Sequence, residues 1–218
     1  MNSKFSRWSV LPAAVLLLGS VAVAQDQSSS GSSPAPAPSQ SAAPAPAKQP
    51  TIAQRKENQQ DRIANGVQSG QLTAGETAHL EGEEAGLNKE ESGMRAEDNG
   101  HLTSADRSLI NKQQNGLSNQ IYQDKHNANT AHYGTNEIGA RRENQQDRIA
   151  QGIRSGQLTA GETSRLEHQE SSINRQDARM RAADGGKLTN GDKKVLNQRL
   201  NNTSKNIYRD EHNGRTQK

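Results

Sequence analysis

The chain repeats itself at a fixed offset of 86 residues. Residues 52–130, the first repeat, reappear as residues 138–216, the second repeat, with roughly half of the paired positions identical. Two blocks return unchanged, residues 57–64 as 143–150 and residues 69–77 as 155–163. A duplication of this length makes the repeat, rather than the whole chain, the unit of folding.

The N-terminus has the pattern of an export signal. Lys4 and Arg7 precede an apolar run over residues 10–23, and Ala22-Val23-Ala24 resembles a small-residue cleavage site. The run is too short for a membrane span, and the chain has no cysteine to accept a lipid or form a disulfide. We therefore expect a signal peptide over residues 1–24, no membrane span, and export to the periplasm or the cell exterior.

Residues 25–51 are rich in proline, alanine and serine. Such a composition favours polyproline II and supplies no core, so we expect a disordered linker that acts as a tether. A proline-rich docking ligand is the alternative. Residues 131–137 are expected to form a second, short linker, and the second repeat then extends over residues 138–218.

The part of the chain that follows the signal is very polar. It retains only three aromatic residues, Tyr122, Tyr133 and Tyr208, and carries 25 basic against 24 acidic side chains. A chain with few aromatic residues and a net charge of only +1 lacks the stacking surfaces and the strong positive charge of a single-strand binder, so no nucleic-acid partner is expected. Leu, Ile and Val are also scarce in the repeats, and either repeat alone is expected to be marginally stable.

Each repeat is predicted to contain three helices, separated by the motif Gly-x-Leu-Thr-x-x-(Glu/Asp). Glycine permits the left-handed conformation that ends a helix, and threonine with an acid three residues later forms a capping box for the next helix. The predicted caps are Gly70, Thr73, Glu76, Gly100, Thr103, Asp106, Gly156, Thr159, Glu162, Gly186, Thr189 and Asp192.

Apolar residues recur between the caps at spacings of three, four and seven, which indicate helices rather than strands. The expected buried positions are Ile63, Val67, Leu80, Leu87, Met94, Ile110, Gln114, Leu117 and Ile121, and in the second copy Ile149, Ile153, Leu166, Ile173, Met180, Leu196, Leu200, Thr203 and Ile207. These stripes are narrow, as in small helical hairpins or a coiled-coil-like bundle. The predicted fold is all-α, with two tandem three-helix repeats.

The two repeats differ in charge. The first has 8 basic and 12 acidic side chains, and the second has 15 basic and 10 acidic. Opposite net charges favour association of one repeat with the other, within one chain or between chains. The expected partner is another protein or a second copy of the chain.

The capping motif resembles the second half of an EF-hand calcium loop, in which a glycine is followed by an aliphatic residue and a final acid. The first half of that loop does not match, because Asn65, Arg95, Gln151 and Arg181 stand where it requires aspartate. The residues that could still bind calcium are Glu97, Asp98, Asn99 and Asp106. The simpler interpretation is helix capping, with no cofactor.

The repeats end in a second shared element, Ile-Tyr-x-Asp-x-His-Asn, at residues 121–127 and 207–213. Its aspartate and histidine could supply metal ligands, but residues two apart on a helix point in different directions. The alternative is that tyrosine packs beside isoleucine, that histidine contacts the negative end of the helix, and that asparagine ends it.

No catalytic motif is present: the chain has no cysteine nucleophile, no Gly-x-Ser-x-Gly elbow and no His-Glu-x-x-His. We therefore expect a non-enzymatic interaction or structural module. The general character of the sequence resembles that of exported bacterial helical-repeat proteins. Its bulk composition also resembles that of hydrophilins, which implies a largely unfolded stress protectant as an alternative, and the EF-hand resemblance implies a degenerate divalent-cation binder as another.

Overall fold

The computed structural model describes residues 49–217, which form six α-helices and, within that range, no strand. The helices are α1 (Ile52–Gln68), α2 (Ala74–Glu97), α3 (Ser104–Lys125), α4 (Glu137–Ser155), α5 (Ala160–Ala183) and α6 (Asn190–Glu211). The predicted all-α class is confirmed for this range. None of these helices is both long and apolar enough to cross a bilayer.

The described residues belong to one compact unit. The expected signal peptide, residues 1–24, lies outside the described residues. So does nearly all of the expected linker over residues 25–51, of which only the last three residues are described.

Hydrogen bonds of side chains fix where the helices begin. In α2 the backbone N–H of Glu76 donates to Thr73 Oγ1 at 3.3 Å, and the Thr73 N–H donates back to Glu76 Oε2 at 2.9 Å. Five of the six helices start with a capping box, with Thr51, Thr73, Thr103, Thr159 and Thr189 at the N-cap. In α4 the cap is Asn136, whose side chain accepts a hydrogen bond from the Gly139 N–H. Each box satisfies backbone donors that the first turn leaves free.

Glycines separate the helices. Gly70 and Gly156 both have φ of 70°, in the left-handed region that glycine adopts without strain. The chain therefore turns sharply between α1 and α2, and again between α4 and α5.

The leucine of each turn folds back onto a glycine of the preceding helix. A Cβ on Gly66 would lie 2.6 Å from the Leu72 side chain, and one on Gly152 would lie 2.6 Å from that of Leu158. Both leucines are fully buried. Since the turn and the helix before it fit this tightly, larger residues are not accommodated at either glycine.

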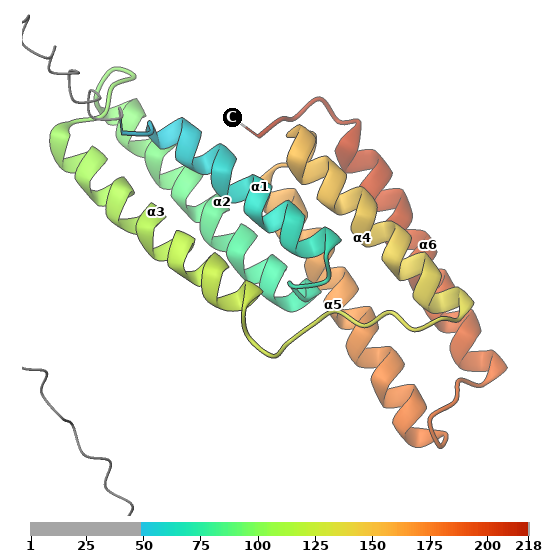
Figure 1. Ribbon diagram of the computed structural model, residues 1–218. Coiled ribbons are helices and arrows are strands. Elements are labelled where there is room, and N and C mark those ends of the chain that lie inside the picture. The colour runs from blue at the N-terminus through green and yellow to red at the C-terminus, as the bar shows by residue number, and fades with distance from the viewer. Residues whose placement is uncertain (1–48, 218) are drawn as a thin grey trace, which may run out of the picture. The chain divides into compact units, whose positions relative to one another are not determined.

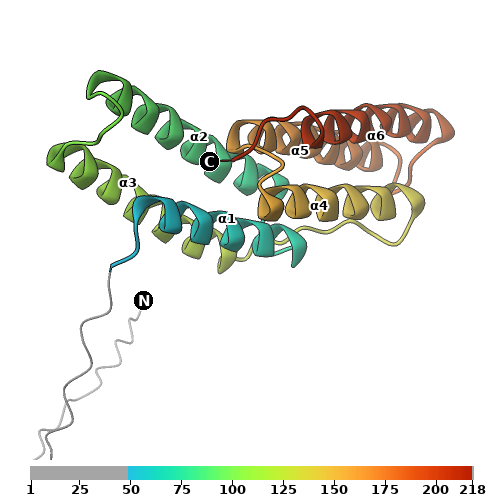
Figure 2. The same ribbon diagram turned by 90° about the horizontal axis from the view of Figure 1, so that it is seen from above.

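Figure 1 shows α1, α2 and α3 packed together, and likewise α4, α5 and α6. The two groups meet where α2 packs against α5 and α1 packs against α4. Seen from above, α1 and α4 meet at their C-terminal ends (Figure 2). There the Arg154 guanidinium donates to the side-chain oxygens of Asn65 at 2.8 Å and Gln68 at 2.9 Å.

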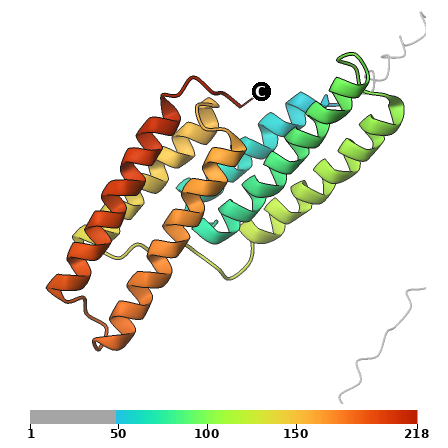
Figure 3. The same ribbon diagram turned by 180° about the vertical axis from the view of Figure 1, so that it is seen from behind.

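Small residues line the contact between α2 and α5, which run antiparallel (Figure 3). Ser164 Oγ donates a 2.7 Å hydrogen bond to the Ala78 carbonyl. A Cβ on Gly82 would lie 3.4 Å from the same serine oxygen. The small side chains at these positions let the two helices approach closely there.

One apolar cluster extends across both groups of helices. It includes Leu80 of α2 and Leu166 of α5, both fully buried, together with residues of α1, α3, α4 and α6. Each large aliphatic side chain buried in this way contributes on the order of 1.5–3 kcal/mol. A second cluster, Ile138, Ile173, Leu196 and Leu200, lies among α4, α5 and α6. The apolar residues of the two repeats therefore form a shared core.

Candidate functional site

Four glutamates occupy the interior beside the contact between α2 and α5. They are Glu81 and Glu84 of α2 and, at corresponding positions, Glu167 and Glu170 of α5, all almost completely buried. A buried carboxylate is costly unless it is protonated or paired. The four side chains therefore define the chemistry of the interior, and we call them the buried glutamate row.

Glutamines of α1 and α4 bind the two central members. Gln60 Nε2 donates to Glu81 Oε2 at 3.2 Å, and Gln146 Nε2 donates to Glu167 Oε2 at 2.9 Å. The glutamines just before them donate to backbone carbonyls, Gln59 to Gln114 and Gln145 to Leu200, both at 2.7 Å. The unchanged block at 57–64 and 143–150 thus contains core residues, although its composition is polar.

Burial keeps the central glutamates protonated. The pKa of Glu81 is raised to about 8, mainly by burial and also by the nearby charge of Glu84, while the Gln60 hydrogen bond opposes the shift. Burial also raises the pKa of Glu167 well above its usual value, with added contributions from the charges of Glu170 and Glu81. Glu81 is therefore mostly uncharged at neutral pH.

The outer members lie near cations. Burial raises the pKa of Glu84 to about 7 against the opposing charge of Lys56, and that of Glu170 to about 7 against Arg142. Each cation also pairs with a second acid, which lies further along the helix that carries the glutamate. Lys56 Nζ lies 2.8 Å from Glu91, and a guanidinium nitrogen of Arg142 lies 3.7 Å from Asp177.

The row can therefore hold and release protons. Residues 49–217 contain no group of three or more histidine or acidic side chains arranged to hold a metal ion. The unpaired oxygens of Glu81, Glu84, Glu167 and Glu170 are buried and receive no hydrogen bond from the described residues.

The candidate calcium residues lie around the turn between α2 and α3. Glu97 ends α2, Asp98 is its C-cap, and Asn99 has φ of 53°. Asp106 is part of the capping box with Thr103, whose hydrogen bonds lower the pKa of the Asp106 carboxyl. The Asp106 carboxylate therefore caps the N-terminus of α3.

The shared element at the end of each repeat places its tyrosine and histidine in a stack. The rings of Tyr122 and His126 have centroids 4.2 Å apart, as do those of Tyr208 and His212. Nδ1 of each histidine lies 2.7 Å from the carbonyl oxygen of its tyrosine. The histidines thus interact with the carbonyl end of the helix.

The asparagine of the same element reaches the start of another helix. Asn127 Nδ2 donates to Glu76 Oε1 at 2.8 Å, and Asn213 Nδ2 donates to Glu162 Oε1 at 2.7 Å. Burial alone would raise the pKa of Glu76, but hydrogen bonds from Asn129, Thr73 and Asn127 together lower it. The capping acids therefore join the end of the third helix to the start of the second.

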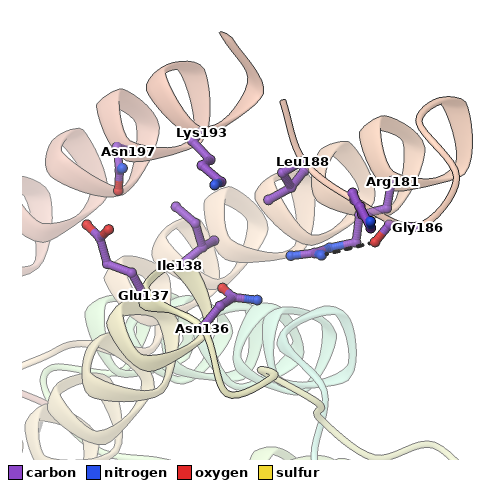
Figure 4. Close-up of a pocket in the computed structure, with 9 residues that line it drawn as sticks. Asn136, Glu137, Ile138, Arg181, Gly186, Leu188, Lys193 and Asn197 are labelled. Carbon is purple, nitrogen blue, oxygen red and sulfur yellow. Dashed lines mark hydrogen bonds between the residues drawn. The ribbon is translucent and has the colours of Figure 1, made fainter. Parts of the chain in front are cut away.

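A hollow of about 380 Å³ lies between the start of α4 and the turn from α5 to α6. Figure 4 shows Arg181 and Lys193 around it, with Glu137 at the N-terminus of α4, and Ile138 drawn between Lys193 and Asn136. Arg181 also donates to the Gly186 carbonyl at 3.4 Å. The hollow has positive charge, and Glu137 already supplies one carboxylate to it.

No known protein family matches the chain, and no curated protein or solved structure is significantly similar to it. Its function is therefore inferred from the geometry of its own residues.

The sequence interpretation missed the buried glutamate row, because glutamate normally marks the solvent side of a helix. One signal was available. Glu81 and Glu84 are identical to Glu167 and Glu170, although the acidic content of the two repeats differs elsewhere. This signal is weak, because the exposed acids Glu57 and Asp61 are likewise identical to Glu143 and Asp147.

Proposed function

We propose that the chain is an exported, non-enzymatic interaction module. In this proposal a signal peptide directs export to the periplasm or cell exterior, the residue 25–51 segment is a tether, and two tandem three-helix units bind protein partners. The buried glutamates act within the interior and join the two units.

The observation that supports this function most directly is a matched pair of exposed tyrosines. Tyr122 on α3 and Tyr208 on α6 are 60% and 61% exposed, although the isoleucine directly before each of them, Ile121 or Ile207, is fully buried. Their histidine neighbours stack on them and hold them in place. A large aromatic side chain fixed at the surface adds little to the core, and such residues are enriched where proteins bind one another.

A second matched pair lies on the same two helices. Leu109 and Val195, which correspond through the offset of 86 residues, are 43% and 41% exposed. The chain therefore has two surfaces, one on each repeat, with similar exposed side chains. A module of this kind can bind one partner at two points, and the second contact then forms at a high effective concentration.

A photo-crosslinking experiment tests this function. A benzophenone amino acid is placed at position 122 or 208 of the full chain in its native cell, and adducts are separated by mass. We expect a defined protein adduct from both positions, of the same mass if the repeats bind the same partner.

Positions 119 and 205 supply the matched control. Asn119 and Lys205 are exposed, lie on α3 and α6, and correspond through the same offset. Adducts that are absent at 122 and 208, or equally abundant at 119 and 205, would contradict the proposal.

A further inference from the structure

Tyr133, between α3 and α4, packs onto the second repeat. The Arg142 guanidinium carbon lies 5.4 Å from the centre of its ring, within the range of a cation–π interaction. The chain just before it is held by a 2.9 Å hydrogen bond from the Ala131 N–H to the Gly70 carbonyl. The Tyr133 hydroxyl is buried and has no hydrogen-bond partner among the described residues.

The repeat relation places a pocket at the corresponding position of the first repeat. Its volume is about 320 Å³. Three of its lining residues correspond, at the offset of 86, to residues near Tyr133 or near the chain just before it: Lys56 corresponds to Arg142, Asp61 to Asp147, and Gly156 to Gly70. The charges of Arg142 and Asp147 both act on the Tyr133 hydroxyl. The pocket therefore has the chemistry of a site that holds tyrosine elsewhere in the same molecule.

The hydrogen bond that precedes the tyrosine is also repeated. The Gln217 N–H donates to the Gly156 carbonyl at 2.9 Å, as Ala131 does to Gly70. The sequence differs at the tyrosine itself, because the residue 86 positions before Tyr133 is Ala47. An alanine methyl group cannot replace a phenol ring, so the first repeat lacks the aromatic group that the second one has.

We propose that this pocket binds the tyrosine side chain of an extended segment presented by a partner protein, with Lys56 placed over the ring as Arg142 is over Tyr133. The proposal specifies the kind of partner for the interaction function above and rests on that function.

An adjoining groove can hold the backbone of the segment. It has a volume of about 680 Å³ and shares Ala53, Lys56 and Gln217 with the pocket. The Gln217 side chain accepts a hydrogen bond from the Ala160 N–H through Oε1, while its buried Nε2 has no acceptor among the described residues. A carbonyl group of the bound segment would satisfy this donor.

A further difference between the two sites lies at Gly139 and its counterpart Ala53. A Cβ on Gly139 would collide with the carbonyl oxygens of Tyr133 and Gly134. The first repeat has Ala53 at that position, so its Cβ keeps a bound backbone farther from α1. Removing this Cβ is therefore expected to strengthen binding of a segment that copies residues around Tyr133.

The test is an NMR titration of the ¹⁵N-labelled chain with a peptide that copies residues 128–137. We expect saturable shifts of the amide signals of Ala53, Asp61 and Gly156. A peptide with Tyr133→Ala should cause no saturable shift at these amides. Equal shifts with both peptides, shifts confined to Gly139 and Arg142, or no shift at millimolar peptide would overturn the proposal.

Variants of the chain make the test specific. Ala53→Gly should raise the affinity for the tyrosine peptide about tenfold by removing the collision. Lys56→Ala should lower it about threefold or more, and Lys56→Arg should retain it, because an arginine supplies the same cation. Unchanged affinity in both Ala53→Gly and Lys56→Ala would also overturn the proposal.

The result is separable from the test of the interaction function. Crosslinks at positions 122 and 208 with no peptide binding would overturn the pocket alone. Peptide binding without crosslinks would overturn the role of the outer helices.

Discussion

Glu81 of the first repeat and Glu167 of the second are close enough for the charge of one to raise the pKa of the other. Both side chains are fully buried, and each accepts a hydrogen bond from a glutamine of its own repeat. Burial favours the protonated form of both. The contact between the repeats therefore includes two acids that are stable there only when uncharged.

The first prediction concerns pH. A carboxyl whose pKa is higher in the folded than in the unfolded state holds an extra proton when folded, so stability is fully present below the unfolded value and is lost as pH rises through the folded value. For Glu81 that window extends from about 4.5 to about 8, and for Glu84 and Glu170 to about 7. The free energy of unfolding should fall across it by up to about 1.4 kcal/mol per pH unit for each extra proton.

Other carboxyls set the acidic limit. The pKa values of Glu76, Glu91 and Glu162 are lowered because their hydrogen bonds together outweigh the effect of burial. Their contribution is present above pH 4.5 and is lost as pH falls through their folded values. Urea unfolding followed by circular dichroism should thus give a maximum near mildly acidic pH, and a maximum above pH 8 would contradict the assignment.

The second prediction isolates the central pair. Replacing Glu81 and Glu167 by glutamine removes both ionisable groups with little change in shape, so the double variant should lose much of the pH dependence and be more stable than the parent at pH 8. Urea unfolding of both proteins at pH 5 and pH 8 measures this. Glu83→Gln is the control, because Glu83 is exposed on the same helix. If the parent and the double variant have the same pH slope, the raised pKa values are wrong.

The third prediction concerns the glycines that face the turn leucines. Gly66→Ala and Gly152→Ala should each lower the free energy of unfolding by about 1–3 kcal/mol, because the new methyl group would overlap the side chain of Leu72 or Leu158. Thermal or urea unfolding gives the values.

Two other helical glycines provide a matched control. Nothing lies within 4 Å of a Cβ built on Gly86 or Gly116. Alanine at these positions should raise stability by about 0.5–1 kcal/mol, since glycine disfavours a helix interior. Similar effects at all four positions would show that Leu72 and Leu158 do not pack as described.

The helical class could be predicted because it depends on local chemistry. The spacing of apolar residues defines a helix face, and the expected seam of the sixth helix, from Leu196 to Ile207, is buried throughout. In the third helix even Gln114, which interrupts the apolar series, is buried, where it donates to the Ile52 carbonyl. The stripes of the third and sixth helices were therefore predicted correctly from their period, whereas Leu87, Met94 and Met180 of the second and fifth helices, expected to be buried, are only partly buried.

The buried glutamate row could not be predicted in the same way. Whether Glu81 faces solvent or the interior depends on α5 packing against α2, and this contact joins residues far apart in the sequence, such as Ser164 and Ala78, which are 86 positions apart. Periodicity within one helix does not reveal that a second helix will cover its polar side. Tyr133 is a similar case, because its contact with Arg142 depends on the path of a loop.

The opposite net charges of the repeats do not produce ion pairs between them. Every ion pair among residues 49–217 joins side chains within one repeat, such as Arg165 with Asp210 at 2.7 Å and Arg148 with Glu211 at 2.9 Å. Apolar and neutral polar contacts join α2 to α5. Association of separate chains through opposite charges stays a prediction.

The last prediction tests the capping boxes. Thr73 and Thr159 each accept a hydrogen bond from the N–H three residues later, so alanine at either position should lower the free energy of unfolding by about 0.5–2 kcal/mol. Ser108→Ala, at an exposed position inside α3, should change it by no more than about 0.5 kcal/mol. A loss of stability in the Ser108 variant as large as in the threonine variants would mean that the hydroxyl groups of Thr73 and Thr159 have no special role at the starts of α2 and α5.

These measurements require a parent chain that is folded in solution. Circular dichroism should show substantial helicity of the parent in dilute buffer. A coil spectrum that becomes helical only on drying would favour a hydrophilin-like protectant.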